Sequence, residues 1–98
     1  LDSKFPEPPT VKVCKDKDKN ILVAWNQNGT ENAFVWILYT KKDEVWDYKI
    51  FPAKCKQAQI DKLVTDIIVT SVDRCGNESK KLIITLKTNE KIRQFDKE

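Results

Sequence analysis

Apolar and polar residues alternate along much of this chain with a period of two. Val11 and Val13 are separated by a lysine, and in the segment 21–25 the apolar residues Ile21, Val23 and Trp25 stand at the first, third and fifth positions. Successive side chains of a β-strand point to opposite faces, so this spacing places the bulky side chains on one face. The pattern predicts two short strands joined by the charged turn 15–20.

Five further segments have strand-like patterns. Residues 33–39 are apolar throughout, which is typical of a central strand covered on both faces. Residues 45–51 follow a short charged turn and end at a proline, and shorter patterns occur at 60–63, 66–72 and 82–86. Turn signals separate the segments at the roughly 8–12-residue spacing that is expected of a sandwich. We therefore expect an all-β fold, a seven-stranded antiparallel β-sandwich.

The predicted core consists of the bulky side chains on the inward faces of these strands. Two tryptophans, Trp25 and Trp36, are too large to leave in solvent, because burying apolar area stabilises by roughly 25 cal/mol per Å². The residues expected in the core are Val11, Val13, Ile21, Val23, Trp25, Trp36, Leu38, Ile60, Leu63, Ile67, Val69, Leu82 and Ile84.

The two ends of the chain differ from its middle in composition. Residues 1–9 contain three prolines and are expected to form an extended linker, and residues 10–87 are expected to form the sandwich. In the charged tail 88–98, Ile92 and Phe95 have the spacing of one helix face, although a frayed terminus is the main expectation. The chain begins with leucine and contains no methionine, so we expect a segment of a longer polypeptide.

The composition excludes several classes of function but does not identify one. The 18 basic and 15 acidic residues are mixed along the chain, which favours a solvated surface over a nucleic-acid-binding face. There is no histidine and no CxxC pair, so the usual zinc ligands and the Ser–His and Cys–His nucleophiles are excluded. No apolar run approaches the ~20 residues that a membrane-spanning helix needs. We expect a monomer without catalytic activity, cofactor, nucleic-acid partner or membrane insertion.

The order of these elements resembles a fibronectin type III domain over residues 8–86. The resemblance rests on the proline-rich entry, on Trp25 in the second strand, on Ile60 and Leu63 in the fifth, and on the segment 69–79 (VTSVDRCGNES), which is similar to the ending of bacterial members. The family is an immunoglobulin-like sandwich that often follows the catalytic domain of secreted or lipoprotein glycoside hydrolases. The resemblance therefore implies an extracytoplasmic, non-catalytic accessory, spacer or docking module of a larger bacterial protein, in contact with a neighbouring domain.

This chain departs from the family at several positions. The tyrosine that braces the corner before the sixth strand is absent, and Thr65 or Asp66 stands near its place. The chain also lacks an Arg-Gly-Asp sequence and a Trp-Ser-x-Trp-Ser motif. In this family the known binding loops lie at one end, which corresponds here to residues 26–32, 52–56 and 74–79.

Trp46 and Tyr48 are candidates for ligand contact. They stand two residues apart and so face the same side of an expected edge strand, where exposed aromatic rings could stack on sugars. The alternative is that they cap the core or contact a neighbouring domain, and Ile50 on the same face favours an inward orientation. A glycan-binding module that uses Trp46 and Tyr48 or the loops at the end of the sandwich is accordingly the main alternative function.

The three cysteines, Cys14, Cys55 and Cys75, leave at least one thiol unpaired. The family fold places Cys55 and Cys75 in loops at the same end, so the resemblance allows a disulfide between them. The alternative is three free thiols that act as small hydrophobic residues.

A third function, a eukaryotic adhesion or receptor ectodomain, would use the glycosylation sequons at Asn28 and Asn77.

Overall fold

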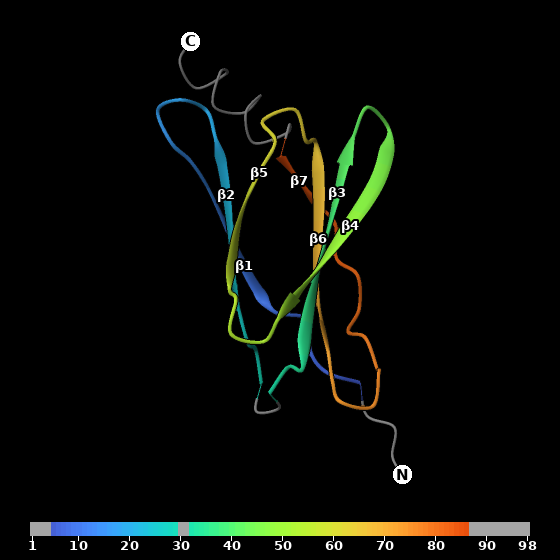
Figure 1. Cartoon of the computed structure of the whole chain (residues 1–98). Helices are drawn as coiled ribbons and strands as arrows, with labels where there is room; N and C mark the ends of the chain where they lie inside the picture. The colour runs from blue at the N-terminus through green and yellow to red at the C-terminus, as the bar shows by residue number, and fades with distance from the viewer. Residues whose placement is uncertain (1–4, 30–31, 87–98) are drawn as a thin grey trace.

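The computed structural model describes residues 5–29 and 32–86, which form seven strands in two antiparallel sheets (Figure 1). The first sheet has the order β1-β2-β5 and contains β1 (Thr10–Lys15), β2 (Ile21–Asn26) and β5 (Gln57–Ile60). The second has the order β4-β3-β6-β7 and contains β3 (Val35–Lys42), β4 (Val45–Pro52), β6 (Asp66–Val72) and β7 (Ile84–Thr85). The expected all-β architecture is confirmed and is compatible with a sandwich. The predicted tail 88–98 lies outside the described residues.

The core lies between the two sheets. Alternate residues of β2 point inward from the first sheet, and alternate residues of β3 and β6 meet them from the second. Trp36 is only 1% exposed, and its Nε1 donates a hydrogen bond to the carbonyl oxygen of Ala53 at 2.9 Å. The fully buried members of the predicted core are Ile21, Val23, Trp25, Trp36, Leu38, Ile67 and Val69. The predicted residues Val11, Val13, Ile60 and Ile84 pack against them and are half-buried.

Leu63 was expected in the core, and this prediction is wrong, because its side chain is 64% exposed. The fifth strand ends at Ile60, earlier than predicted, since Asp61 begins a turn there. Its carboxylate accepts a hydrogen bond from the amide of Leu63 at 2.8 Å, and its carbonyl accepts one from the amide of Val64 at 3.1 Å. The turn directs Leu63 outward and places Val64 in the core instead.

Leu82 is the second wrong core prediction, since it is exposed to solvent. The chain pairs with β6 at Glu78 and again at Ile84 and Thr85, but residues 80–83 are not part of a strand. Because the pairing resumes only at Ile84, the inward positions are taken by Ile84 and Leu86.

Two turns at opposite ends of the sandwich have the same construction. In residues 16–20 the carboxylate of Asp16 accepts hydrogen bonds from the backbone amide of Asn20, at 3.0 Å, and from its side chain. In residues 73–77 the carboxylate of Asp73 binds Asn77 in the same two ways. These hydrogen bonds lower the pKa of each aspartate, the backbone bond from the asparagine contributing most. Both aspartates therefore have a structural role in closing a loop.

The two turns differ at the fourth position, which predicts a stability change. Gly76 adopts φ = 88°, and Lys19 adopts φ = 69°, a left-handed conformation that costs energy for residues with a Cβ. Lys19→Gly is expected to raise the free energy of unfolding by roughly 0.5–1 kcal/mol. The reciprocal Gly76→Lys should lower it by a similar amount, because a Cβ at Gly76 meets no atom within 4 Å and only the backbone is strained. Urea titrations of both variants would show this, and equal signs would contradict the explanation.

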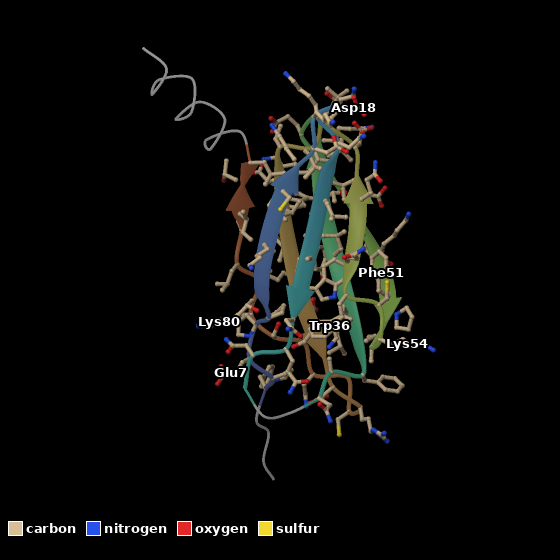
Figure 2. The ribbon with its side chains drawn as sticks, turned by 90° about the vertical axis from the view of Figure 1, so that its left-hand side faces the viewer. Glu7, Asp18, Trp36, Phe51, Lys54 and Lys80 are labelled. Carbon is tan, nitrogen blue, oxygen red and sulfur yellow. The ribbon has the colours of Figure 1, made fainter. Side chains whose placement is uncertain are left out.

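The chain enters and leaves the sandwich at opposite ends (Figure 1). The entering segment is fixed to β6 by a hydrogen bond of 3.1 Å from Ser71 Oγ to the carbonyl oxygen of Glu7. Figure 2 shows Glu7 and Lys80 towards this end and the Asp18 turn at the other end, to which β7 leads. The long axis of the domain therefore separates its entry from its exit.

Candidate binding surface

Trp46, Tyr48 and Ile50 form an exposed row along β4, here named the outer strip. Phe51, of the opposite parity, packs edge-on against Trp25 in the core, with ring centroids 5.4 Å apart. The outer strip therefore faces solvent, and its members are 41%, 61% and 58% exposed. The inward orientation expected from Ile50 is wrong, because Phe51 is the residue of β4 that reaches the core.

Residues of β3 stand directly beside the outer strip. The register pairs Lys41 with Trp46, Tyr39 with Tyr48 and Ile37 with Ile50. The Lys41 ammonium lies 5.9 Å from the centre of the Trp46 ring, and the rings of Tyr39 and Tyr48 are 6.2 Å apart. Lys41 is also 3.8 Å from the carboxylate of Asp66. The result is an apolar and aromatic surface whose nearest charges are already paired.

Glu78 connects this same face to the segment that follows β6. Its Oε2 accepts hydrogen bonds from Tyr39 Oη at 2.5 Å and from Thr70 Oγ1 at 2.7 Å, and Lys81 Nζ lies 3.6 Å from its other oxygen. Lys81 also sits over the Tyr39 ring, 5.3 Å from its centre. We call these four residues the Glu78 cluster.

The Glu78 cluster shifts the ionisation of two of its members. Burial and the hydrogen bond to Glu78 raise the pKa of Tyr39 from 10.0 to about 12. Burial alone would raise the pKa of Glu78, but the hydrogen bonds from Tyr39 and Thr70 and the charge of Lys81 outweigh it, so that this pKa is lowered. The cluster is therefore a neutral phenol bound to an ionised carboxylate at neutral pH.

Sequence reasoning gave no sign of the Glu78 cluster. Tyr39 and Glu78 are 39 residues apart, and Glu78 follows a turn in which a solvated carboxylate would be ordinary. The one local signal is the alternation in β6, where Thr70 is a polar residue within an apolar strand and is fully buried. A buried hydroxyl requires a hydrogen-bond partner, and Glu78 is that partner.

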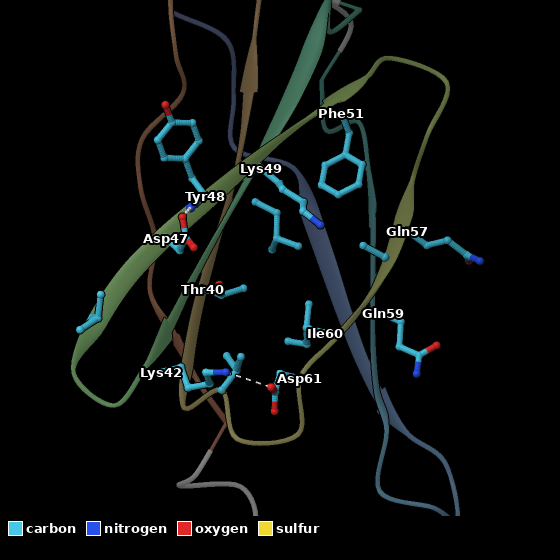
Figure 3. A pocket seen from close by; sticks show the side chains of 14 residues that line it. Thr40, Lys42, Asp47, Tyr48, Lys49, Phe51, Gln57, Gln59, Ile60 and Asp61 are labelled. Atoms are coloured by element: carbon cyan, nitrogen blue, oxygen red, sulfur yellow. Dashed lines mark hydrogen bonds and ion pairs between the residues drawn. The ribbon is translucent and has the colours of Figure 1, made fainter.

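A groove of about 590 Å³ separates β4 from β5, the facing edges of the two sheets (Figure 3). Lys49 and Phe51 extend from β4 into it, and Ile60 lies opposite on β5. At one end Lys42 Nζ and Asp61 Oδ2 form an ion pair of 3.0 Å. The hydrogen bond between them raises the pKa of Lys42, and the amide of Leu63 together with Lys42 lowers the pKa of Asp61. These two groups hold each other in the charged state, so neither is suited to exchange a proton.

The segments 26–32, 52–56 and 74–79, which the resemblance matches to binding loops, contact neighbouring parts of the chain. Lys56 of the second segment is bound to the end of β2, because its carbonyl oxygen accepts from the amide of Trp25 at 2.9 Å and its Nζ donates to Asn26 Oδ1 at 3.4 Å. In the third, the Arg74 guanidinium lies 5.9 Å from the centre of the exposed Phe34 ring. Residues 30 and 31 of the first loop lie outside the described residues.

The structure does not form the disulfide considered between Cys55 and Cys75, and all three cysteines are free thiols. Cys55 belongs to a turn in which its amide donates to the carbonyl of Pro52, and its Sγ lies 3.7 Å from the carbonyl oxygen of Gln57. Cys75 belongs to the Asp73 turn, where its amide donates to the carboxylate at 3.0 Å. Each turn is closed by its own hydrogen bonds and needs no cross-link.

The Asn77 sequon also has a structural role. The side-chain amide of Asn77 donates to Asp73 at 3.1 Å, and Ser79 is buried with its Oγ accepting from the amide of Ser71 at 3.0 Å. A glycan on Asn77 would replace one of the two hydrogens of the amide group that makes the first of these bonds. The sequon residues are therefore explained by the turn and the strand that follows it.

Comparisons with known proteins leave the function to be argued from the structure. A scan of known protein-family models found no match to this chain, and a search of curated proteins found no relative. Within residues 5–29 and 32–86 there is no helix of the length and apolarity that crossing a membrane requires. The same residues contain no cluster of three or more histidine, cysteine or acidic side chains that could hold a metal ion.

Proposed function

We propose that this chain is a non-catalytic accessory module that docks against an apolar surface of a neighbouring domain through the outer strip. The observation that carries the proposal is the exposure of Trp46, Tyr48 and Ile50 on one face of an ordered sheet. A contiguous exposed apolar patch on a soluble domain usually marks a contact surface. Tryptophan and tyrosine are also the side chains most enriched at the energetic centres of protein interfaces.

We further propose a fibronectin type III-like identity for the domain, in an extracytoplasmic bacterial protein that acts on carbohydrate. The strand order supports an immunoglobulin-like arrangement, in which the first, second and fifth strands share one sheet and the third, sixth and seventh share the other. β4 differs from the constant-type arrangement because it pairs with β3. The bacterial and carbohydrate context rests on the resemblance of residues 69–79 alone and is an analogy.

The surroundings of the outer strip favour a protein partner over a sugar. A sugar site needs an open ring face and polar groups that are free to bind hydroxyls. Here the Lys41 ammonium lies over Trp46. The outer strip ends at aliphatic Ile50, which is paired with Ile37 of β3. The nearby carboxylate of Glu78 already accepts hydrogen bonds from Tyr39 and Thr70. These features suit an apolar protein surface better than a hydroxylated ligand.

Entry and exit at opposite ends support the spacing role. A domain inserted in a longer chain in this way separates its neighbours by its own length (Figure 1). The ordered apolar strip along its side then provides a surface against which one neighbour can rest.

Serine substitution of all three outer-strip residues tests the docking role. In the isolated chain the unfolding temperature should change little, because exposed side chains contribute less than about 0.5 kcal/mol each. In the longer polypeptide that contains the chain, the flanking domain should unfold several degrees lower, roughly what the loss of 1–2 kcal/mol of interface energy produces. Differential scanning calorimetry measures both.

The matched control replaces Leu63 and Leu82 with serine, since both are large, exposed and outside the outer strip. The docking proposal fails if the control and the outer-strip variant lower the unfolding temperature of the flanking domain equally, or if neither changes it.

Glycan binding remains the second candidate because the rings of Trp46 and Tyr48 are exposed, and affinity electrophoresis in polysaccharide gels distinguishes it. Retardation of the isolated chain that the serine variant loses would favour the sugar.

A further inference from the structure

β4 is an edge strand whose outer edge is open. Among the described strands it pairs with β3 alone, and it runs along the margin of its sheet (Figure 1). The amide of Tyr48 is hydrogen-bonded to the carboxylate of its own neighbour, Asp47, at 2.9 Å. This amide therefore points away from β3, towards the free edge.

The geometry of an antiparallel ladder extends this conclusion to the rest of β4. Residues alternate between those whose backbone groups bind the neighbouring strand and those whose groups face away. Since the Tyr48 amide faces the free edge, the backbone groups of Trp46 and Ile50 face it as well. The residues between them, Asp47 and Lys49, direct their backbone groups towards β3.

The sequence of β4 is complementary to itself when it is reversed about Tyr48. In an antiparallel pair of two copies centred on this residue, Asp47 stands opposite Lys49 of the second copy, and Lys49 opposite its Asp47. Tyr48 meets Tyr48, and Trp46 meets Ile50. Both charged pairs then join opposite signs, and the three apolar pairs (Tyr48 with Tyr48, and Trp46 with Ile50 twice) lie on the same face. These are cross-strand combinations that stabilise a sheet.

The hydrogen-bonding pattern at the free edge of β4 also fits a pairing centred on Tyr48. Pairing centred on Tyr48 uses the backbone groups of Trp46, Tyr48 and Ile50, which are those at the free edge. Asp47 and Lys49 then occupy the sites between the hydrogen-bonded pairs, where the side chains of opposite strands approach most closely. A shift of the pairing by two residues would keep the backbone bonds but lose both charged pairs, because Asp47 would then stand opposite Asp47, or Lys49 opposite Lys49, of the second copy.

We propose that two copies of this chain associate through their β4 edges, antiparallel and centred on Tyr48, so that their four-stranded sheets form one continuous sheet. The partner is a second copy because charge, apolar face and backbone register all match under a two-fold axis. This association replaces the expectation of a monomer. It goes beyond the docking role, and it joins two outer strips into one longer apolar band that remains open on its face.

The dimer should be weak and concentration-dependent. A single pair of strands buries less than the ~1,600 Å² of a standard interface. Asp47 must also release the Tyr48 amide, so its carboxylate changes from an intrachain cap to a partner of Lys49. A dissociation constant on the order of 100 µM is expected.

Charge reversal tests the pairing directly. Asp47→Lys places two like-charged pairs across the axis, and so does Lys49→Asp, so each variant alone should weaken the dimer by about tenfold or more. The double variant D47K/K49D restores both opposite-charge pairs and should recover the wild-type affinity. An equimolar mixture of the two single variants should form a heterodimer. Sedimentation equilibrium over a concentration series measures all four.

Asp18→Lys is the control for net charge, because Asp18 is exposed in the β1–β2 turn, and it should leave association unchanged. Circular dichroism confirms that each variant is folded. As a second readout, the Tyr48 amide of the wild-type chain should exchange with deuterium more slowly as the concentration rises. The proposal is overturned if the wild-type chain stays monomeric at millimolar concentration, if both single variants associate as the wild type does, or if exchange at Tyr48 is independent of concentration.

Discussion

Replacing Trp36 with alanine is expected to lower the free energy of unfolding by about 3–5 kcal/mol, the largest effect of any substitution considered in this chain. Trp36 is fully buried on β3, an inner strand of the four-stranded sheet, and its indole N–H donates a hydrogen bond to the carbonyl oxygen of Ala53. The substitution leaves a cavity between the sheets and an unpaired carbonyl on the loop after β4. Domains of this size are stable by about 5–15 kcal/mol, so a large part of the total would be lost.

Trp46→Ala is the matched control, because the same side chain is removed from the neighbouring strand but from an exposed position. It should cost less than about 0.5 kcal/mol. Guanidinium titration followed by circular dichroism compares the two. Equal losses from both variants would contradict the assignment of Trp36 to the core and of Trp46 to the surface.

Glu78→Ala is expected to lower the free energy of unfolding by about 2–4 kcal/mol, because it removes one acceptor from two hydroxyl groups at once. Thr70 is fully buried and has no route to water, whereas Tyr39 is half-buried. Alanine also leaves Lys81 without its carboxylate partner. Glu78→Gln keeps an acceptor of similar shape and should cost less, which separates the effect of the negative charge from that of the hydrogen bonds and packing.

The same cluster fixes the direction of a pH dependence. The folded-state pKa of Tyr39 is raised from 10.0 to about 12, so its contribution to stability is complete below pH 10 and is lost as the pH rises through 12. The pKa of Glu78 is lowered from 4.5, so its contribution is present above pH 4.5 and is lost as the pH falls below that value. Glu78→Ala should remove much of both dependences.

Titration of the tyrosine absorbance with pH measures the pKa of Tyr39 directly. In a Tyr48→Phe background the remaining phenol is Tyr39, and its pKa should fall towards 10 when Glu78 is replaced by alanine. An unchanged pKa of Tyr39 would show that burial, and not the Glu78 carboxylate, is responsible for the whole shift.

The strands could be predicted from the sequence because a period of two is a local property. β2 is the clearest case, since Ile21, Val23 and Trp25 alternate with smaller or more exposed neighbours. β4 shows the limit of the same reasoning. It has bulky residues on both faces, Trp46, Tyr48 and Ile50 on one and Phe51 on the other, so the period cannot say which face is inward.

Contacts between distant segments could not be predicted from local pattern. The Glu78 cluster joins β3, β6 and the segment after it, and the groove exists because the edges of β4 and β5 belong to different sheets. Leu63 was misplaced for a related reason, because the turn at Asp61 shifts the phase of the side chains by a step that hydrophobicity alone does not reveal. The one sequence signal for this turn was Asp61 itself, because an aspartate carboxylate can accept a hydrogen bond from the amide two residues later.

The entry and exit at opposite ends also determine how the domain would respond to mechanical tension in a longer polypeptide. β1 is paired with β2 along its whole length, Thr10–Lys15, so pulling on the entering segment loads all of its hydrogen bonds in shear at the same time. Within the described residues, β7 is paired with β6 at Ile84 and Thr85, and one further backbone bond joins the amide of Leu86 to the carbonyl oxygen of Thr65. Force applied along the chain would therefore detach β7 first. The sheet β1-β2-β5 would remain folded while the detached segment extended.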